Sequence, residues 1–272
     1  MITFPNAKIN IGLNITSRRP DGYHNIETLF YPISLCDVLE IVPSQSNKTT
    51  LSITGMEIDG DVEQNLIMKA YRLLQSSHQL PAVEIHLHKV IPFGAGLGGG
   101  SSDAAYTLRM LRDMFALPLD DDKLAQCVSQ LGADCAFFIY NTPLLATGIG
   151  DEFASIDFTL KGKYILLVKP SISVPTAQAY SQVIPYLPDS PLSRRITTPI
   201  GQWRDNVVND FEKSVFSIHP RIAAIKQRLY DMGAEYAAMS GSGSSVFGIF
   251  NEACSYATIF PDCFIWQGKC DV

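Results

Sequence analysis

Alternation of apolar and polar residues marks the first element of the chain. The odd-numbered positions from residue 7 to residue 15 are all aliphatic: Ala7, Ile9, Ile11, Leu13 and Ile15. The positions between them carry Lys8, Asn10, Gly12 and Asn14. A period of two over this length is typical of a half-buried strand. Lys8 and Asn10 therefore share its polar face.

The same patterns predict several further elements. We expect strands at 38–42, 50–54, 83–89, 164–169, 235–239 and 245–250, and helices at 65–75, 101–115, 122–131 and 221–232. Val83, Ile85 and Leu87 should point inward, which turns His86 and His88 outward. Because strands and helices mix without strict alternation, the chain is predicted to be α+β.

A change of composition around residues 148–162 indicates a crossing between two domains. The predicted domains are residues 1–155 and residues 156–272. The segment 181–203 is rich in proline and serine, and we expect it to consist mainly of loops. Gly233 follows the last predicted helix, at the position where a glycine commonly ends a helix.

Composition restricts the possible partners. The chain has 272 residues, of which 46% are hydrophobic and 18% charged, and a net charge of −6. Its longest basic clusters are two arginine pairs, at 18–19 and 194–195. Nucleic acids and anionic membranes require clustered basic surface, so we expect neither as a partner. A small anionic ligand must then be held by backbone amides and single cations.

The sequence also suggests a cytoplasmic location. We expect no signal peptide, and no apolar run reaches the roughly 20 residues of a membrane span. The 6 cysteines show no Cys-x-x-Cys spacing. They are therefore interpreted as free thiols in a reducing compartment, and we expect no zinc site.

A glycine-rich run lies between the strand at 83–89 and the helix that begins near residue 101. Its residues are Pro92, Phe93, Gly94, Ala95, Gly96, Leu97, Gly98, Gly99, Gly100, Ser101 and Ser102. Glycines let backbone amides approach an oxygen closely, and a helix N-terminus adds unpaired N–H groups. The run thus indicates a phosphate site, since a flexible linker rarely carries proline, leucine and paired serines. The serines have three possible roles: capping the helix, binding a phosphate oxygen, or reaching a metal ion. No Gly-Lys-Ser/Thr follows, which excludes a Walker A loop.

The run resembles the ATP loop of the GHMP kinases, which include galactokinase, homoserine kinase and the mevalonate and phosphomevalonate kinases. Other segments extend the resemblance in order along the chain: 5–10, 21–24, 94–104, 132–134, 209–212 and 240–243. These segments together resemble most closely the GHMP kinases that phosphorylate 4-diphosphocytidyl-2-C-methyl-D-erythritol. The resemblance implies a two-domain fold, with a ribosomal protein S5 domain 2-like N-terminal domain and a ferredoxin-like C-terminal domain. It also implies that ATP and substrate meet in the cleft between the domains.

Two residues are the catalytic candidates. By resemblance, Lys8 holds the substrate hydroxyl and spreads the charge of the transferring phosphoryl group. The pattern alone leaves a solvated lysine on an edge strand equally open. Asp134 is the implied general base, and its alternative is an aspartate in a turn after a helix. Family members often have Val-Pro after this aspartate, whereas this chain has Cys135 and Ala136.

The resemblance assigns the remaining site residues to substrate recognition. Asn10 points toward the substrate, Tyr23 stacks on its cytosine, and His24 bonds the edge of the base. Tyr180 is a candidate for the second stacking wall, in an uncertain register. As bare residues, Tyr23 and His24 also suit simple turn packing after the Asp21-Gly22 pair.

The implied reaction is phosphorylation of the tertiary C2 hydroxyl by ATP with Mg²⁺, on the non-mevalonate route to isoprenoid precursors. Lys89 is placed near the adenine or the phosphates, and Asn65 caps a helix or lines the nucleotide site. The loop at 240–244 closes over phosphates or forms a plain turn. The alternatives are another GHMP kinase, of the homoserine or mevalonate type, and a non-catalytic nucleotide-binding module. A monomer or a weak homodimer is expected.

Overall fold

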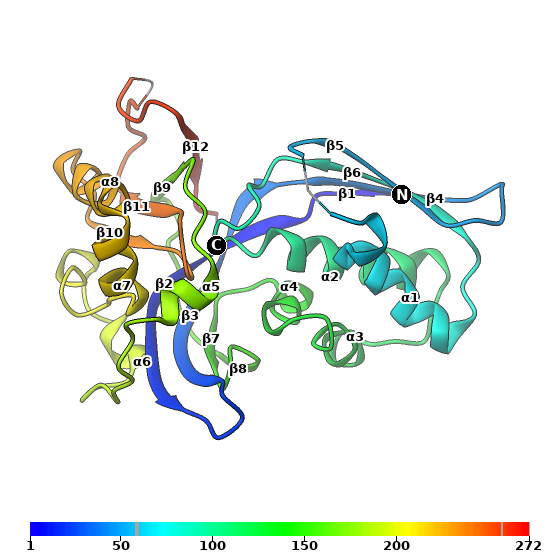
Figure 1. The fold of residues 1–272 in the computed structure, drawn as a ribbon, viewed down its shortest axis with the longest axis horizontal. Helices are drawn as coiled ribbons and strands as arrows, with labels where there is room; N and C mark the ends of the chain where they lie inside the picture. The colour runs from blue at the N-terminus through cyan, green and yellow to red at the C-terminus, as the bar shows by residue number, and fades with distance from the viewer. Residues whose placement is uncertain (58–59, 257, 272) are drawn as a thin grey trace. The chain divides into compact units, whose positions relative to one another are not determined.

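The computed structural model describes residues 1–57, 60–256 and 258–271, and its ribbon is drawn in Figure 1. The chain forms two compact units, each made of segments that alternate along the sequence. The first contains Met1–Ala7, Leu35–Phe93 and Gly98–Asn141, and the second contains Lys8–Ser34, Gly94–Leu97 and Thr142–Val272. The boundary after residue 155 remains a prediction about domains, because these units interleave and do not divide at one point.

The first unit contains a four-stranded sheet in the order β1-β4-β6-β5. Its strands are β1 (Ile2–Thr3), β4 (Val38–Pro43), β6 (Val83–Lys89) and β5 (Thr50–Gly55). Alternation in β6 is confirmed: Val83, Ile85 and Leu87 are buried. His86 and His88 lie on the other face, where both bond to the hydroxyl of Thr54.

Helices lie on one side of this sheet, with α3 and α4 packed on α2 and not on the sheet itself (Figure 1). They are η1 (Val62–Gln64), α1 (Leu66–His78), α2 (Gly99–Met114), α3 (Asp121–Val128), η2 (Ala133–Cys135) and α4 (Phe137–Tyr140). Asn65 caps α1, since its side-chain oxygen accepts the N–H of Ile67 at 2.9 Å. Helix α3 ends at Val128, three residues before the predicted end at Leu131.

One sheet of the second unit carries the strand predicted from residues 7–15. Its order is β2 (Asn6–Arg18), β3 (His24–Cys36), β7 (Leu144–Thr147) and β8 (Glu152–Ser155). The apolar side chains of β2 are buried, as the alternation predicts. The expectation of a half-buried strand is wrong, because Lys8, Asn10 and Asn14 on the polar face are buried as well. The patterns did not predict β3, because a run of apolar residues from 29 to 33 hides any period of two.

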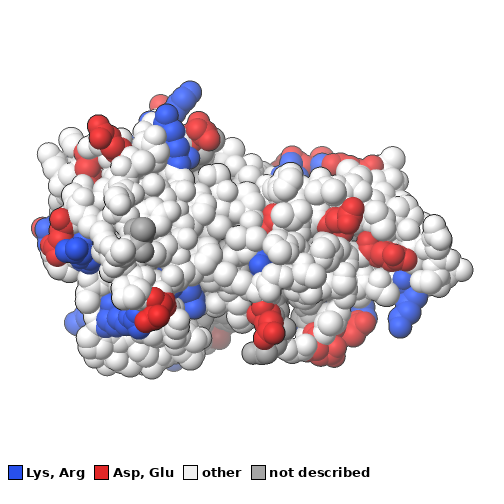
Figure 2. Space-filling view, turned by 90° about the horizontal axis from the view of Figure 1, so that it is seen from above, with Lys and Arg blue, Asp and Glu red and all other residues white. Residues whose placement is uncertain are grey.

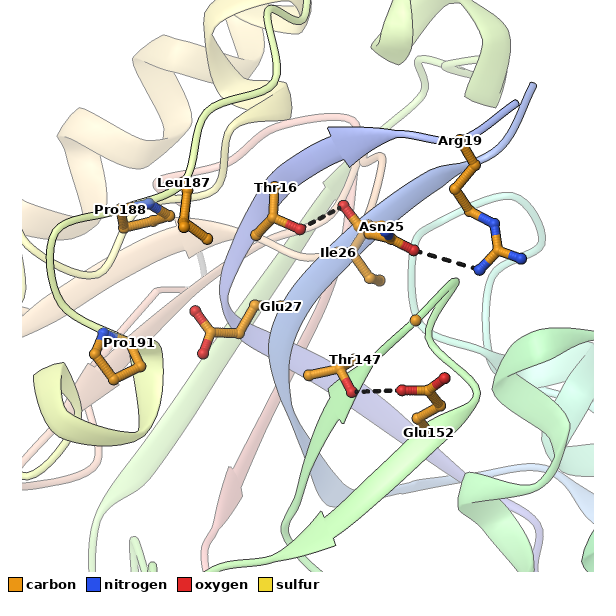
Figure 3. A pocket seen from close by; sticks show the side chains of 11 residues that line it. Thr16, Arg19, Asn25, Ile26, Glu27, Thr147, Glu152, Leu187, Pro188 and Pro191 are labelled. Atoms are coloured by element: carbon orange, nitrogen blue, oxygen red, sulfur yellow. Dashed lines mark hydrogen bonds between the residues drawn. The ribbon is translucent and has the colours of Figure 1, made fainter. Parts of the chain in front are cut away.

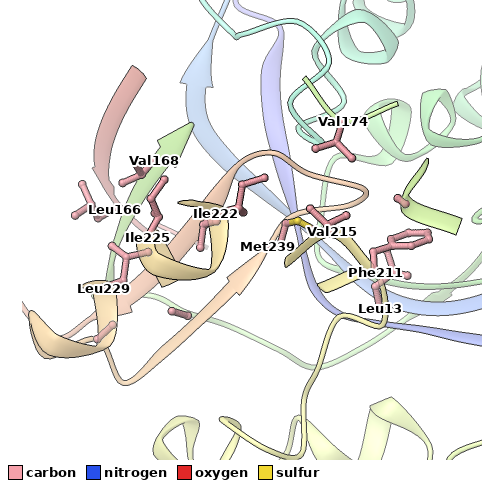
Figure 4. Packing of buried hydrophobic residues seen from close by; sticks show 14 of the residues in the cluster. Leu13, Leu166, Val168, Val174, Phe211, Val215, Ile222, Ile225, Leu229 and Met239 are labelled. Atoms are coloured by element: carbon pink, nitrogen blue, oxygen red, sulfur yellow. The ribbon is translucent and has the colours of Figure 1, made fainter. Parts of the chain in front are cut away.

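The other sheet of the second unit has the order β10 (Tyr236–Met239), β11 (Val246–Phe250), β9 (Tyr164–Pro170) and β12 (Cys263–Lys269). Helices α7 (Phe211–Ile218) and α8 (Pro220–Asp231) pack on it through the apolar cluster of Figure 4. Gly233 follows α8 with a φ of +93°, which confirms its predicted place beyond the helix end. The segment 181–203 holds only the short α6 (Leu192–Arg195) and η3 (Ile200–Gln202), and α5 (Thr176–Tyr180) precedes it.

The segment 209–212 joins several parts of the second unit. Asp210 accepts the backbone N–H of Ile15 at 2.7 Å. Asn209 donates to the carbonyls of Met239 and Gly241 at 2.7 and 2.9 Å. This segment therefore fixes β2 and the loop after β10 in one arrangement.

Two glycine-containing loops of the second unit pack backbone to backbone. The hydroxyl of Ser240 donates to the carbonyl of Gly96 at 2.8 Å, and the N–H of Ser245 to that of Ala95 at 3.3 Å. Gly96 has a φ of +74°, and a Cβ there would overlap the carbonyl oxygen of Ser240 and lie 2.9 Å from its carbon. Only glycine fits this close approach.

The surface carries charges of both signs. On the face shown in Figure 2, acidic and basic side chains are interspersed over mostly uncharged surface. Among the described residues, no helix has the length and apolar character that a membrane crossing requires.

The packing of Gly96 yields a prediction with a matched control. Gly96→Ala should lower the free energy of unfolding by about 2–4 kcal/mol, because the methyl group overpacks the contact and the positive φ is strained. Gly94→Ala meets the same strain at a φ of +60° but has nothing within 4 Å of the added Cβ. It should cost only about 1 kcal/mol. If urea unfolding gave the same loss of unfolding free energy for Gly96→Ala and Gly94→Ala, the Ser240 contact would not constrain the loop.

Candidate functional site

Lys8 is buried in the second unit, with 3% of its surface exposed. Its backbone N–H donates to the carbonyl of Leu97 at 3.0 Å, so its strand is tied to the glycine-rich run. Its ammonium donates to the side-chain oxygen of Asn10 at 2.7 Å and lies 4.7 Å from the centroid of the Phe30 ring. The alternative of a solvated lysine on an edge strand is wrong, since this side chain is withdrawn from water.

Asn10 fixes the direction of the Lys8 side chain. Its amide nitrogen donates to the hydroxyl of Thr28 at 3.0 Å, and Thr28 donates to the carbonyl of Gly12 at 2.5 Å. The backbone N–H of Asn10 donates to Ser240 at 3.2 Å. Because both ends of the amide are bonded, its orientation is determined, and its oxygen faces Lys8.

The glycine-rich run is held at several points. Gly94, Gly96 and Gly98 all have positive φ, which lets the backbone turn sharply three times. Helix α2 begins at Gly99, two residues earlier than the predicted start. Its first N–H groups lack partners within the helix and carry the positive end of its dipole. With the bonds from Lys8, Ser240 and Ser245, the run is a fixed loop and not a flexible linker, and its binding of an anion stays a prediction.

Asp134 lies in η2 of the first unit, and its side chain is half-buried. The next residue, Cys135, is buried and its thiol forms a hydrogen bond with the side chain of Ser101. Burial raises the pKa of this thiol to about 11, so it stays protonated and chemically inert at neutral pH. Asp134 is thus adjacent in sequence to a residue packed on the first turn of α2. Lys8 and Asp134 belong to different compact units.

Three aromatic side chains of the second unit form the cytosine candidates. The rings of His24 and Tyr180 are stacked, with centroids 4.7 Å apart and planes 20° apart. Phe211 supports Tyr180 from its edge, at 4.7 Å and 82°. Tyr23 is 62% exposed, so its ring is available to a ligand. The register of Tyr180, which the sequence left open, therefore places it beside His24.

The charge state of His24 suits recognition of a neutral base. Burial lowers the pKa of His24 below its ordinary value, and the positive charge of Arg18 lowers it further. The ring is then neutral at pH 7, with one nitrogen as donor and the other as acceptor. Such a ring can read a base edge that presents both kinds of group.

A pocket of about 310 Å³ lies beside the glycine-rich run in the first unit. Its lining includes Asn65, Leu66, Lys89, Phe93, Gly100 and Asp103. Phe93 is 73% exposed. The sequence pointed to Lys89 and Asn65 but missed Asp103. Alternation in β6 offered a signal, since Lys89 follows Val83, Ile85 and Leu87 at the inward positions. A buried lysine requires carboxylate partners.

A larger hollow of about 660 Å³ lies in the second unit, along β2 and β3 (Figure 3). Its lining among the described residues includes none of the predicted site residues. Thr16 donates a hydrogen bond to the backbone carbonyl of Asn25, and Arg19 donates one to the side-chain oxygen of Asn25. Thr147 donates to the carboxylate of Glu152. These polar groups satisfy one another, so size alone does not make this hollow the site.

Within the described ranges, no group of three or more histidine, cysteine, aspartate and glutamate side chains is arranged to hold a metal ion.

Comparison with known proteins gives the family. Residues 65–142 match the GHMP kinases N terminal domain and residues 199–253 match the GHMP kinases C terminal domain. The chain is 52% identical over 271 residues to the 4-diphosphocytidyl-2-C-methyl-D-erythritol kinase of Parabacteroides distasonis, covering 99% of each protein.

Solved structures agree with this match. The chain is similar to the crystal structure of a 4-(cytidine 5'-diphospho)-2C-methyl-D-erythritol kinase, with a TM-score of 0.81, 30% identity and 100% coverage of both chains. The mevalonate kinase of Methanococcus jannaschii shares the fold, with a TM-score of 0.75, 14% identity, and coverage of 99% of this chain and 98% of its own. The chain therefore belongs to the 4-diphosphocytidyl-2-C-methyl-D-erythritol kinase family within the GHMP kinases, and it is an ATP-dependent kinase.

Proposed function

We propose that this chain transfers the γ-phosphoryl group of ATP to the C2 hydroxyl of 4-diphosphocytidyl-2-C-methyl-D-erythritol. The products are ADP and the 2-phosphate, on the non-mevalonate route to isoprenoid precursors. The observation that carries the proposal is the buried ammonium of Lys8, fixed by Asn10 and joined through its backbone to the glycine-rich run. A cation fixed beside an anion-binding loop is what phosphoryl transfer requires.

In the proposed mechanism, Lys8 and Asp134 act on the same hydroxyl. Asp134 accepts the hydroxyl proton as the new oxygen–phosphorus bond forms and the bond to the ADP oxygen breaks. Lys8 lowers the energy of the emerging alkoxide and of the charge on the phosphoryl oxygens. The Asn10 and Thr28 bonds hold Lys8 in one orientation, so little reorganisation is needed during transfer.

Recognition of the cytidine handle is assigned to Tyr23, His24 and Tyr180. The exposed ring of Tyr23 stacks on the cytosine, and His24 bonds its edge. Tyr180 forms the second wall, supported by Phe211. In support, His24 and Tyr180 already lie in stacked contact, and the lowered pKa of His24 keeps it neutral.

ATP is assigned to the glycine-rich run, residues 92–102, and its adenine to the pocket lined by Asn65, Lys89 and Phe93. Mg²⁺ is proposed to enter with ATP and to keep most of its ligands from phosphate and water. The donor set fits such an ion, since the oxygen-bearing side chains of the run are the hydroxyls of Ser101 and Ser102. The oxygen of Ser102 is buried with no hydrogen-bond partner in the described part of the chain. When bound, Mg²⁺ neutralises phosphate charge.

The partners and the location of the protein are proposed as well. We infer a cytoplasmic enzyme that is a monomer or a weak homodimer and does not bind nucleic acid or membranes. The net charge of −6 and the interspersed charges on the face in Figure 2 support the part about nucleic acid and membranes.

Replacement of the catalytic candidates tests the mechanism. Lys8→Met should lower kcat by about 10²–10³-fold, because it removes one charge-stabilising donor. Asp134→Asn should lower kcat by about 10²-fold or more, since the base is lost while its shape is kept. Coupled ADP release with the cytidyl substrate measures both. Unchanged turnover in Asp134→Asn would refute the role of general base.

Replacement of His24 tests the cytidine assignment. His24→Ala should raise the KM for the cytidyl substrate by about tenfold or more, with little change in the KM for ATP. His88→Ala is the control, because His88 is exposed on β6 and bonds only Thr54 among the described residues. An equal rise for both variants, or a rise in the KM for ATP alone, would contradict the assignment.

A panel of acceptor alcohols tests the substrate against its rivals. We expect ADP release with the cytidyl substrate and none above background with homoserine or mevalonate. Neither rival carries a cytosine for Tyr23 and His24. Activity with only homoserine or mevalonate would make the chain another GHMP kinase. ATP binding without transfer to any alcohol would indicate a non-catalytic nucleotide-binding module.

A further inference from the structure

Three charged side chains are buried together in the first unit. The ammonium of Lys89 donates to a carboxylate oxygen of Asp37 at 2.5 Å and to Oδ2 of Asp103 at 2.7 Å. The exposed fractions of these side chains are 2% for Lys89, 0% for Asp37 and 4% for Asp103. The triad holds two potential negative charges against one positive charge.

The triad spans the glycine-rich run. Asp37 accepts the backbone N–H groups of Val90 at 2.6 Å and Ile91 at 2.8 Å, the two residues directly before residue 92. Asp103 is the fifth residue of α2, directly after residue 102. Lys89 bridges the two carboxylates. One bonded group therefore connects the point where the chain enters the run with the point where it leaves.

The start of helix α2 packs tightly against this triad. A Cβ on Gly99 would lie 3.1 Å from the ammonium of Lys89 and 2.9 Å from a methyl carbon of Ile91. The start of the helix thus approaches the triad as closely as a backbone without a side chain allows. A small displacement of Lys89 would leave a gap or a clash under the first turn.

The arrangement is costly for stability alone. Buried ion pairs are often replaced by apolar side chains without loss of stability, because desolvation offsets their attraction. Here Oδ1 of Asp103 is also buried without a hydrogen-bond partner in the described ranges. Lys89 and Asp103 both line the pocket beside the run. A costly polar group at a pocket wall indicates a role in the site.

We propose that Asp103 is a positioning residue for the nucleotide: by accepting a hydrogen bond from Lys89, it clamps the two ends of the glycine-rich run and keeps the run ready to bind ATP. The proposal rests on the proposed function only in taking the run as the ATP site. Preorganisation of this kind lowers the ordering cost of binding and leaves the chemical step unchanged.

The clamp needs an acceptor at position 103, and it does not need a charge. Burial raises the pKa of Asp103 to about 7, the nearby Asp37 charge adds to the rise, and the attraction of Lys89 opposes it. A proton on Oδ1, the oxygen without a partner, leaves the bond from Lys89 to Oδ2 intact. Asparagine has the shape of this neutral form and keeps an acceptor for Lys89.

The raised pKa gives a pH-dependent signature in stability. The folded chain keeps a proton on Asp103 that the unfolded chain loses near pH 3.8. The contribution of this carboxyl to the free energy of unfolding therefore falls as pH rises from about 4 to about 7. Asp103→Asn removes that loss. The free energy of unfolding of Asp103→Asn relative to wild type should therefore increase with pH over this window and level off above it. A difference that is constant with pH would show that Asp103 titrates normally.

The direct test compares ATP affinity and loop protection in two variants. Asp103→Leu removes the acceptor and should weaken ATP binding, measured by calorimetry, by about tenfold or more. Asp103→Asn keeps the acceptor and should stay within about threefold of wild type. At saturating ATP, kcat and the KM for the alcohol should be nearly unchanged in both. Amide hydrogen exchange without ligand should rise in residues 92–102 for Asp103→Leu only.

Control variants distinguish the effect of losing the Lys89–Asp103 bond from a general loss of stability. Glu235→Gln removes another ion pair, with Lys163 at 2.6 Å, and should leave ATP affinity unchanged. Asp103→Ala is a second variant, which removes the acceptor without adding a branched side chain. Equal ATP affinity in Asp103→Leu, Asp103→Ala and wild type, or an equal loss in Asp103→Asn, would overturn the proposal. Failure of wild type to phosphorylate the cytidyl substrate would refute the proposed function, while ATP affinity and exchange would still decide the clamp.

Discussion

The close packing of backbone against backbone at Gly96 is the constraint on which the arrangement of the candidate site residues within the second unit depends. Because no side chain intervenes, Ser240 reaches the carbonyl of Gly96 and also accepts the N–H of Asn10. Lys8 is tied to the same run through Leu97. One small contact thus sets the position of the run, of the strand that carries Lys8, and of the loop after β10 together.

Hydrogen bonding of polar groups away from water is the second common feature. Lys8 and Asn10 are buried on the polar face of β2, where a chain of bonds through Thr28 determines their directions. Lys89 is buried at the end of β6 between two carboxylates. In both places a lysine is withdrawn from solvent and fixed. A fixed cation needs little reorganisation when phosphate charge develops nearby, which is what an ATP-dependent kinase requires.

Local patterns predicted the parts of this fold that depend on neighbours in the sequence. Alternation predicted β2 and β6, and the glycine-rich run was correctly placed between a strand and a helix. Strand β3 was missed because its run of apolar residues has no period. The stacking of His24 on Tyr180 and the bond between Lys89 and Asp37 join residues far apart in the chain, the latter 52 positions apart. Such contacts depend on tertiary structure, and one sequence does not reveal them. The roles of the site residues remain predictions.

The central claim is that Lys8 serves transfer of phosphate from ATP to a cytidyl diphosphate alcohol. The most direct measurement follows labelled γ-phosphate from ATP into the cytidyl substrate, with wild type and Lys8→Met at saturating concentrations of both substrates. The account predicts one labelled product, the 2-phosphate, formed by wild type and nearly absent with Lys8→Met, while both proteins bind ATP equally. Label transfer at equal rates by the two proteins, or no transfer by wild type, would contradict it.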